Sequence, residues 1–268
     1  MDACSGGWVA AVVDGRTARV AFEPDRGFAA TLAALAPLDR VLVDMPVGLP
    51  ESGTRRCDDL ARRVLGTRHA TVFTPPTRSV VEDRAALDYE AARERNDGPT
   101  LSKQTWNIVP TVGEVDDALA VADGRAVVDG VPVRECHPEV ALWALSGGFP
   151  LAYSKHDRRG LVARRRVLAD HLANAVAAYD RAVEATLRKH VGRDDVLDAL
   201  ALAASGVHDA ELASLPSSPP TDLRGLPMEI AFPETTGAAR MMEVVADDND
   251  ADGTDGADAG DTDDTDEG

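Results

Sequence analysis

Apolar and polar residues near the start of the chain follow a pattern that predicts β-strands. Two Val- and Ala-rich runs are separated by Asp14-Gly15, a strong signal for a β-hairpin, and a Gly-Gly turn precedes the first run. We therefore predict a three-stranded meander over residues 2–22. A short Ala/Leu helix over 28–35 follows, and then an unalternated apolar run over 40–44, which is typical of a strand buried on both faces.

Helical signals dominate the next part of the chain. Capping residues, helical spacing and Gly or Pro stops predict several short helices between residues 51 and 125. A strand over 131–137 then runs into Pro138, and proline suits the first position of a helix. One long helix is predicted over 158–190.

The last predicted helix, residues 193–206, is nearly apolar except for acidic residues in its first two turns. Capping and the helix dipole account for Asp194, and they offer an alternative explanation for Asp195. Asp198 lies about one turn further in, where capping no longer favours a carboxylate, and it shares a helix face with Asp195. This pattern points to a metal or catalytic site, with a cap and solvated edge as the alternative.

The length and composition fit one folded domain with an acidic extension. The chain has 268 residues, of which 44% are hydrophobic, enough for one substantial core. Its formal charge is −18, but residues 247–268 hold eleven Asp or Glu and no Lys or Arg, which leaves about −7 for the rest. We predict a domain over 1–232, followed by a linker and a disordered acidic tail over 233–268.

Three further features concern the environment of the protein. Only three of the 28 basic residues are lysines, and this preference for Arg, together with abundant Asp, resembles proteins of salt-loving microbes. The three cysteines fit neither a disulfide framework nor a zinc site. No apolar run of about twenty residues and no cationic signal sequence is present, so we predict a cytoplasmic protein without a membrane partner. The oligomeric state stays open.

The order of these elements is that of a ribonuclease-H-like α/β fold. We predict a mixed five-stranded sheet flanked by helices, with a helical insertion, about 51–125, between the fourth and fifth strands. Ligands of such sheets bind at the carboxyl ends of strands. The acidic residues expected there or on the last helix are Asp2, Asp44, Glu135, Asp195 and Asp198.

Converging carboxylates repel one another unless cations neutralise them, and oxygen ligands suit Mg²⁺ or Mn²⁺. Two such ions can activate a water and stabilise the leaving oxygen in phosphodiester hydrolysis.

Several sequence motifs also resemble those of domain-of-unknown-function family 429, a family of predicted ribonuclease-H-like nucleases. The matching segments are residues 2–8, 44–50, 56–58, 73–78, 101–104, 114–116, 135–139, 154–156 and 194–199. The last helix is also similar to that of Holliday-junction resolvases, in which an Asp pair at this spacing holds metal. The resemblance implies that Asp2, Asp44, Asp195 and Asp198 are metal ligands. The chain departs from the family pattern at its start: a few apolar residues precede this Asp in the family, whereas only Met1 precedes Asp2 here.

Five other residues are candidates for the site. Glu135 is either an additional catalytic ligand or the partner of a nearby Arg. His137 either orients a substrate phosphate or a water, or acts as a structural hydrogen-bonding residue. Lys103 and Gln104 lie in a polar break that suits a phosphate contact. Lys155 either contacts phosphate or belongs to a segment that caps the following helix.

Two basic clusters are the candidates for holding a polyanion, with a solvated helix face as the alternative. They are Arg55, Arg56, Arg62, Arg63 and Arg68, and Arg158, Arg159, Arg164, Arg165 and Arg166.

Three functions follow from these features. The leading hypothesis is a divalent-metal-dependent nuclease that hydrolyses phosphodiester bonds of nucleic acid. The alternative is a non-catalytic module of the same fold that binds nucleic acid or junctions. A small-molecule phosphotransferase ranks third, since sugar kinases and actin share this sheet topology, and only the Gly6-Gly7 turn supports it.

Overall fold

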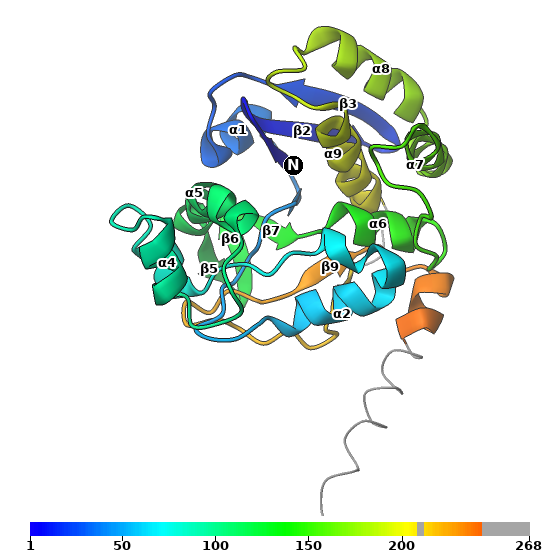
Figure 1. Ribbon diagram of the computed structural model, residues 1–268. Helices are drawn as coiled ribbons and strands as arrows, with labels where there is room; N and C mark the ends of the chain where they lie inside the picture. The colour runs from blue at the N-terminus through cyan, green and yellow to red at the C-terminus, as the bar shows by residue number, and fades with distance from the viewer. Residues whose placement is uncertain (208–211, 243–268) are drawn as a thin grey trace, which may run out of the picture.

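The N-terminal meander forms at the predicted place in the computed structural model, which describes residues 1–207 and 212–242 (Figure 1). Its strands, paired antiparallel in chain order, are β1 (Asp2–Cys4), β2 (Gly7–Asp14) and β3 (Thr17–Phe22). Gly15 has a φ of 57° in the turn that brings Asp14 opposite Thr17, a conformation that glycine adopts without steric cost. The Asp-Gly signal is therefore confirmed.

A second sheet mixes parallel and antiparallel pairs in the order β4-β7-β6-β5. Its strands are β4 (Val41–Val43), β5 (Ala120–Ala122), β6 (Arg125–Val128) and β7 (Val131–Glu135). β4 pairs in parallel with β7, which places the carboxyl ends of these two strands side by side. The hairpin of β5 and β6 was not expected from the sequence, which predicted helix up to about residue 125.

Short helices occupy most of the predicted insertion. They are α2 (Arg56–Leu65), the 3-10 helix η1 (Gly66–Thr71), α3 (Arg78–Glu82), α4 (Tyr89–Arg95) and α5 (Lys103–Ala118). In Figure 1, α4 and α5 lie on the side of β5 and β6, whereas α2 lies by β9 (Ile230–Phe232), the partner of β8 (Ala213–Leu215).

The predicted long helix over 158–190 is two helices. After β7 the chain forms α6 (Pro138–Leu145), α7 (Arg158–His171), α8 (Ala175–Ala185) and α9 (Arg193–Gly206). Between α7 and α8, the side-chain Nδ2 of Asn174 donates to Ala18 O at 2.8 Å, and its Oδ1 accepts from Ala18 N at 2.8 Å. These bonds satisfy the backbone of β3 and hold the chain there in a non-helical conformation.

Helix α9 is the centre of the largest core cluster, as its apolar sequence predicts. Its residues from Val196 to Leu202 are buried, and it packs against β2 on one side and α6, α7 and α8 on the others (Figure 1). The helix also contacts β1 and β4, so its first two turns reach the place where these strands meet.

The five predicted strands do not form one sheet, because β1 and β4 share no strand ladder. Backbone hydrogen bonds of Met1 connect them: its N donates to Leu42 O at 2.6 Å, and Asp44 N donates to Met1 O at 2.9 Å. A cavity of about 530 Å³ lies beside this contact, between β2, α1 (Phe28–Leu35), β4 and the end of α9. The α/β class is confirmed, but the strands are divided between a three-stranded and a four-stranded sheet.

The C-terminal part packs onto α6. Within the predicted linker, residues 236–242 are helical and Ala238 is fully buried. Thr235 Oγ1 donates to Ala144 O at 3.0 Å. The predicted acidic tail, from residue 243 onward, lies outside the described residues. In the described part of the chain, no helix is long and apolar enough to span a membrane.

Candidate metal centre

Three predicted carboxylates meet at one point of the fold. Asp2 belongs to β1, Asp44 directly follows β4, and Asp198 projects from the second turn of α9. One oxygen from each lies within 4.8 Å of the others. The Met1 hydrogen bonds hold β1 beside β4, and α9 packs across both strands. We call these three residues the acidic cluster.

The acidic cluster carries negative charge that its surroundings poorly neutralise. Asp2 is 8% exposed and Asp198 is 3% exposed. Burial raises the pKa of Asp44 to about 7 and that of Asp198 to about 6. Burial, followed by the charge of Asp44, raises the pKa of Asp2 well above its ordinary value. Each carboxylate therefore tends to hold a proton where no cation compensates its charge.

Besides the Met1 ammonium, whose charge lowers the pKa of Asp44, the acidic cluster has a second cation, Lys155. Its Nζ donates to Asp198 Oδ2 at 2.6 Å and lies 3.6 Å from Asp194 Oδ2. The two predicted roles of Lys155 were a phosphate contact and part of a helix cap. Instead, its ammonium pairs with a carboxylate of the acidic cluster.

Asp195 lies near the cluster but has a separate role at the start of α9. Its Oδ2 accepts from Gly192 N at 2.8 Å, which caps the helix. The capping alternative from the sequence therefore describes its contacts, and Asp195 is not one of the three residues whose oxygens converge.

Glu135 faces away from the cluster because of strand register. Glu135 is paired with Val43, so its side chain lies on the same face as that of Val43 and opposite to that of Asp44. Its Oε2 and Oε1 accept from the Arg55 guanidinium at 2.6 and 2.8 Å, and Oε2 also accepts from Val47 N at 2.8 Å. Of the two roles predicted for Glu135, its contacts match the pairing with Arg.

His137 is held by hydrogen bonds on both sides of its ring. Nδ1 accepts from Glu139 N at 3.2 Å and so caps α6, which leaves Nε2 to donate to Thr71 O at 3.1 Å. Burial lowers the pKa of His137, in keeping with a neutral ring. These contacts match the structural alternative. Lys103 and Gln104 are exposed in the first turn of α5, where Lys103 Nζ lies 4.2 Å from the centroid of the Tyr89 ring.

Glu139 was not singled out in the sequence, although its charge acts on the acidic cluster. It raises the pKa values of both Asp44 and Asp198. Its Oε1 accepts a hydrogen bond from Nη2 of the fully buried Arg164, and Arg68 Nη2 lies 3.6 Å from the same oxygen. Its position in the first turn of the helix that follows β7 was a usable signal, because the ends of β4 and β7 are adjacent.

The acidic cluster suits a hard metal ion. Its donors are all carboxylate oxygens, the type of ligand that Mg²⁺ and Mn²⁺ prefer. Burial raises the pKa values of all three carboxyl groups, and a bound cation would offset this cost of burying charge. The structure thus contains three acidic residues that could bind a metal ion.

Comparison with known families supports the resemblance seen in the sequence. A family model described as "Protein of unknown function (DUF429)" matches residues 1–221. The chain belongs to the DUF429 family. No curated protein and no solved structure matches it. The matched range of this DUF429 protein includes the acidic cluster and Lys155, so the candidate centre lies within the family domain.

We predict that the stability of the metal-free protein falls as pH rises. The ordinary pKa of Asp44 is 3.8 and its folded value is about 7, so between these values the folded state binds more protons than the unfolded state. The free energy of unfolding then decreases with pH. Urea unfolding in EDTA at several pH values should show this slope, and Asp44→Asn should make it shallower.

Two comparisons isolate the contribution of Asp44. Burial also raises the pKa of Glu135 to about 7. Glu135 is present in both wild type and Asp44→Asn, so its contribution to the pH dependence of stability cancels when the two slopes are compared. Asp14→Asn, at the exposed end of β2, should leave the slope unchanged. Equal slopes for wild type and Asp44→Asn would contradict the prediction.

Proposed function

We propose that this DUF429 protein is a divalent-metal-dependent nuclease of ribonuclease-H-like architecture. The observation that carries the proposal is the convergence of Asp2, Asp44 and Asp198 from two strands and the last helix, with oxygens within 4.8 Å of one another. A bound Mg²⁺ or Mn²⁺ would supply an activated water and stabilise the oxygen that leaves. The cytoplasmic location expected from the sequence agrees with such an enzyme.

The residues of the chain contribute binding and orientation. Asp2, Asp44 and Asp198 would hold the cation, and they would release bound protons when it binds. Arg164 fixes Glu139, and His137 caps α6, so the wall beside the cluster is rigid. The bidentate pair between Arg55 and Glu135 holds the segment after Asp44 against β7.

Side chains on and beside the loop that carries Lys155 support a nucleic-acid substrate. The loop between α6 and α7, which contains Lys155, exposes Phe149 (70%) and Tyr153 (42%). Arg159 lies with Cζ 5.5 Å from the Tyr153 ring centroid, and Arg158 beside it is exposed. Aromatic rings can stack on bases, and arginines bind phosphates. Arg55 and Arg164 of the predicted basic clusters are instead buried in ion pairs.

A cleavage assay tests the proposal. Wild-type protein should cleave one or more of single- and double-stranded DNA and RNA in Mn²⁺ but not in EDTA. Asp44→Asn should lose this activity while keeping its circular dichroism spectrum, and Asp14→Asn should keep both. If Mn²⁺-loaded wild-type protein binds these nucleic acids but cleaves none, the proposal is overturned in favour of the non-catalytic binding module.

A further inference from the structure

Lys155 places a positive charge directly on one carboxylate of the acidic cluster. We propose that a divalent cation displaces the Lys155 ammonium from Asp198, so that this lysine competes with the metal ion for the site. This inference rests on the proposed metal centre and adds a means of regulating it. Once released, the ammonium becomes available to a substrate phosphate.

The contacts of Lys155 place its charge among the candidate ligands. The Nζ–Oδ2 distance to Asp198 is 2.6 Å, and the Asp198 side chain is only 4% exposed, so little water screens this pair. The same ammonium lowers the pKa values of Asp2 and Asp44. Its charge is therefore felt by all three members of the acidic cluster.

A divalent ion and this ammonium would compete for the same negative charge. Mg²⁺ binds carboxylate oxygens at about 2.0–2.1 Å. An ammonium held on another oxygen of the same carboxylate would lie close to that ion, and the two positive charges would repel in a poorly solvated site. Metal binding and the Lys155–Asp198 bond therefore oppose each other.

The surroundings of Lys155 allow its side chain to move while the backbone stays in place. Arg164 Nη1 donates to Tyr153 O at 2.9 Å, and a Cβ at Gly160 would lie only 1.9 Å from Ser154 O, so the loop packs closely on α7. The Lys155 side chain is 30% exposed and has four rotatable bonds. Rotation about these bonds can carry Nζ away from Asp198 without unpacking a helix.

Lysine NMR gives a direct test, because the chain has only three lysines, Lys103, Lys155 and Lys189. In the full chain labelled with ¹⁵N-lysine, the Lys155 ammonium signal is the one missing in Lys155→Arg. We expect Mg²⁺ to shift or broaden this signal as the ammonium loses its carboxylate partner and exchanges faster with water. The signals of Lys103 and Lys189 should not change. An unchanged Lys155 signal, with Mg²⁺ binding verified by calorimetry, overturns the inference.

Mn²⁺ affinity provides a second test that does not depend on activity. Lys155→Gln should bind Mn²⁺ about tenfold more tightly than wild type, within the usual range for coupled sites. Arg193→Gln is the matched control, because it removes a positive charge from the exposed first residue of α9, and it should change the affinity much less. Equal affinities for wild type and Lys155→Gln overturn only the role of Lys155. Absence of Mn²⁺ binding in both overturns the metal centre as well.

Discussion

Replacing Asp198 with Asn is expected to abolish Mn²⁺-dependent cleavage and to weaken Mn²⁺ binding while the fold is retained. Asn has nearly the same shape as Asp but lacks the charge that holds a divalent ion in a buried site. A bound metal ion contributes several kcal/mol of transition-state stabilisation, so we expect a loss of about 1000-fold in rate. Single-turnover cleavage and Mn²⁺ calorimetry measure the two effects separately.

Asp195→Asn is the matched control for this prediction, since it makes the same chemical change one turn earlier on the same helix. Asp195 accepts the Gly192 hydrogen bond as the N3 residue of the capping box, and the side-chain oxygen of Asn can accept the same bond. We therefore expect Asp195→Asn to keep most of the activity. If both variants lose activity equally, Asp195 is a ligand, as the family resemblance implies, and the distinction drawn from the structure is wrong.

Two members of the acidic cluster could be anticipated because they stand at identifiable positions. Asp44 ends a continuous apolar strand, and Asp198 lies in a helix at a place where capping gives no reason for an acid. Both features are local and can be read from the sequence. The position of Lys155 could not be read in this way, because it lies in a loop whose path is set by packing against α7.

Strand register explains the difference between the expected and observed environments of Glu135. The sequence placed Glu135 near the end of the fifth predicted strand, and it is the last residue of β7, which pairs with β4. Side chains alternate between faces, however, and the residue beside Asp44 on the same face is Cys136, which directly follows β7 and whose N donates to Val43 O at 2.9 Å. Only the register of β4 and β7 decides this, and a single sequence does not specify it.

Two hairpins in the second sheet were missed although their signal was present. Asp123-Gly124 and Asp129-Gly130 occupy the turns on either side of β6, and all four residues have positive φ, from 50° to 82°. This is the Asp-Gly hairpin signal that located the first turn of the chain. The strands on either side of these turns are short, and the helical pattern that precedes them was extended too far, to about residue 125.

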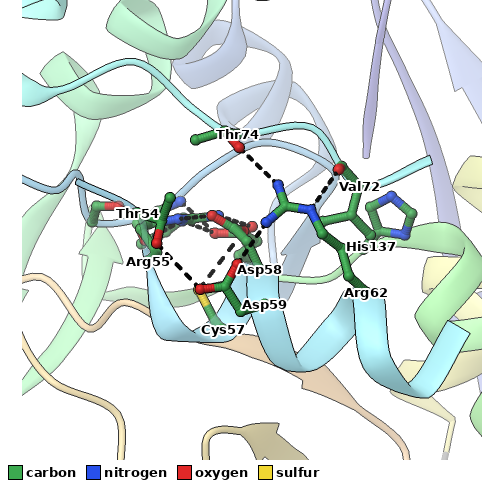
Figure 2. A network of polar contacts seen from close by, with 12 residues as sticks. Thr54, Arg55, Cys57, Asp58, Asp59, Arg62, Val72, Thr74 and His137 are labelled. Atoms are coloured by element: carbon green, nitrogen blue, oxygen red, sulfur yellow. Dashed lines mark hydrogen bonds and ion pairs between the residues drawn. The ribbon is translucent and has the colours of Figure 1, made fainter. Parts of the chain in front are cut away.

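Replacing Arg55 with Met is expected to destabilise the fold by about 3–5 kcal/mol, because it leaves buried carboxylates without a partner. Arg55 is 2% exposed. Its guanidinium donates to Asp58 at 2.6 and 3.0 Å (Figure 2). It also donates to Glu135 at 2.6 and 2.8 Å and to the carbonyls of Val47 and Gly48. Without this guanidinium, the buried carboxylates of Asp58 and Glu135 have no cationic partner. The segment that follows Asp44 also loses the hydrogen bonds to its carbonyls.

Urea unfolding of a short series of variants measures this effect and its cause. Arg95→Met, which breaks the exposed pair with Asp83, should cost about 0–1 kcal/mol. Adding Asp58→Asn and Glu135→Gln to Arg55→Met should recover part of the loss, since the stranded charges are then absent. The Arg55→Met protein should also gain stability relative to wild type as the pH is lowered, because protonation neutralises the same carboxylates. If Arg55→Met lowers the free energy of unfolding no more than Arg95→Met does, the Arg55 network does not hold the segment after β4 against the end of β7.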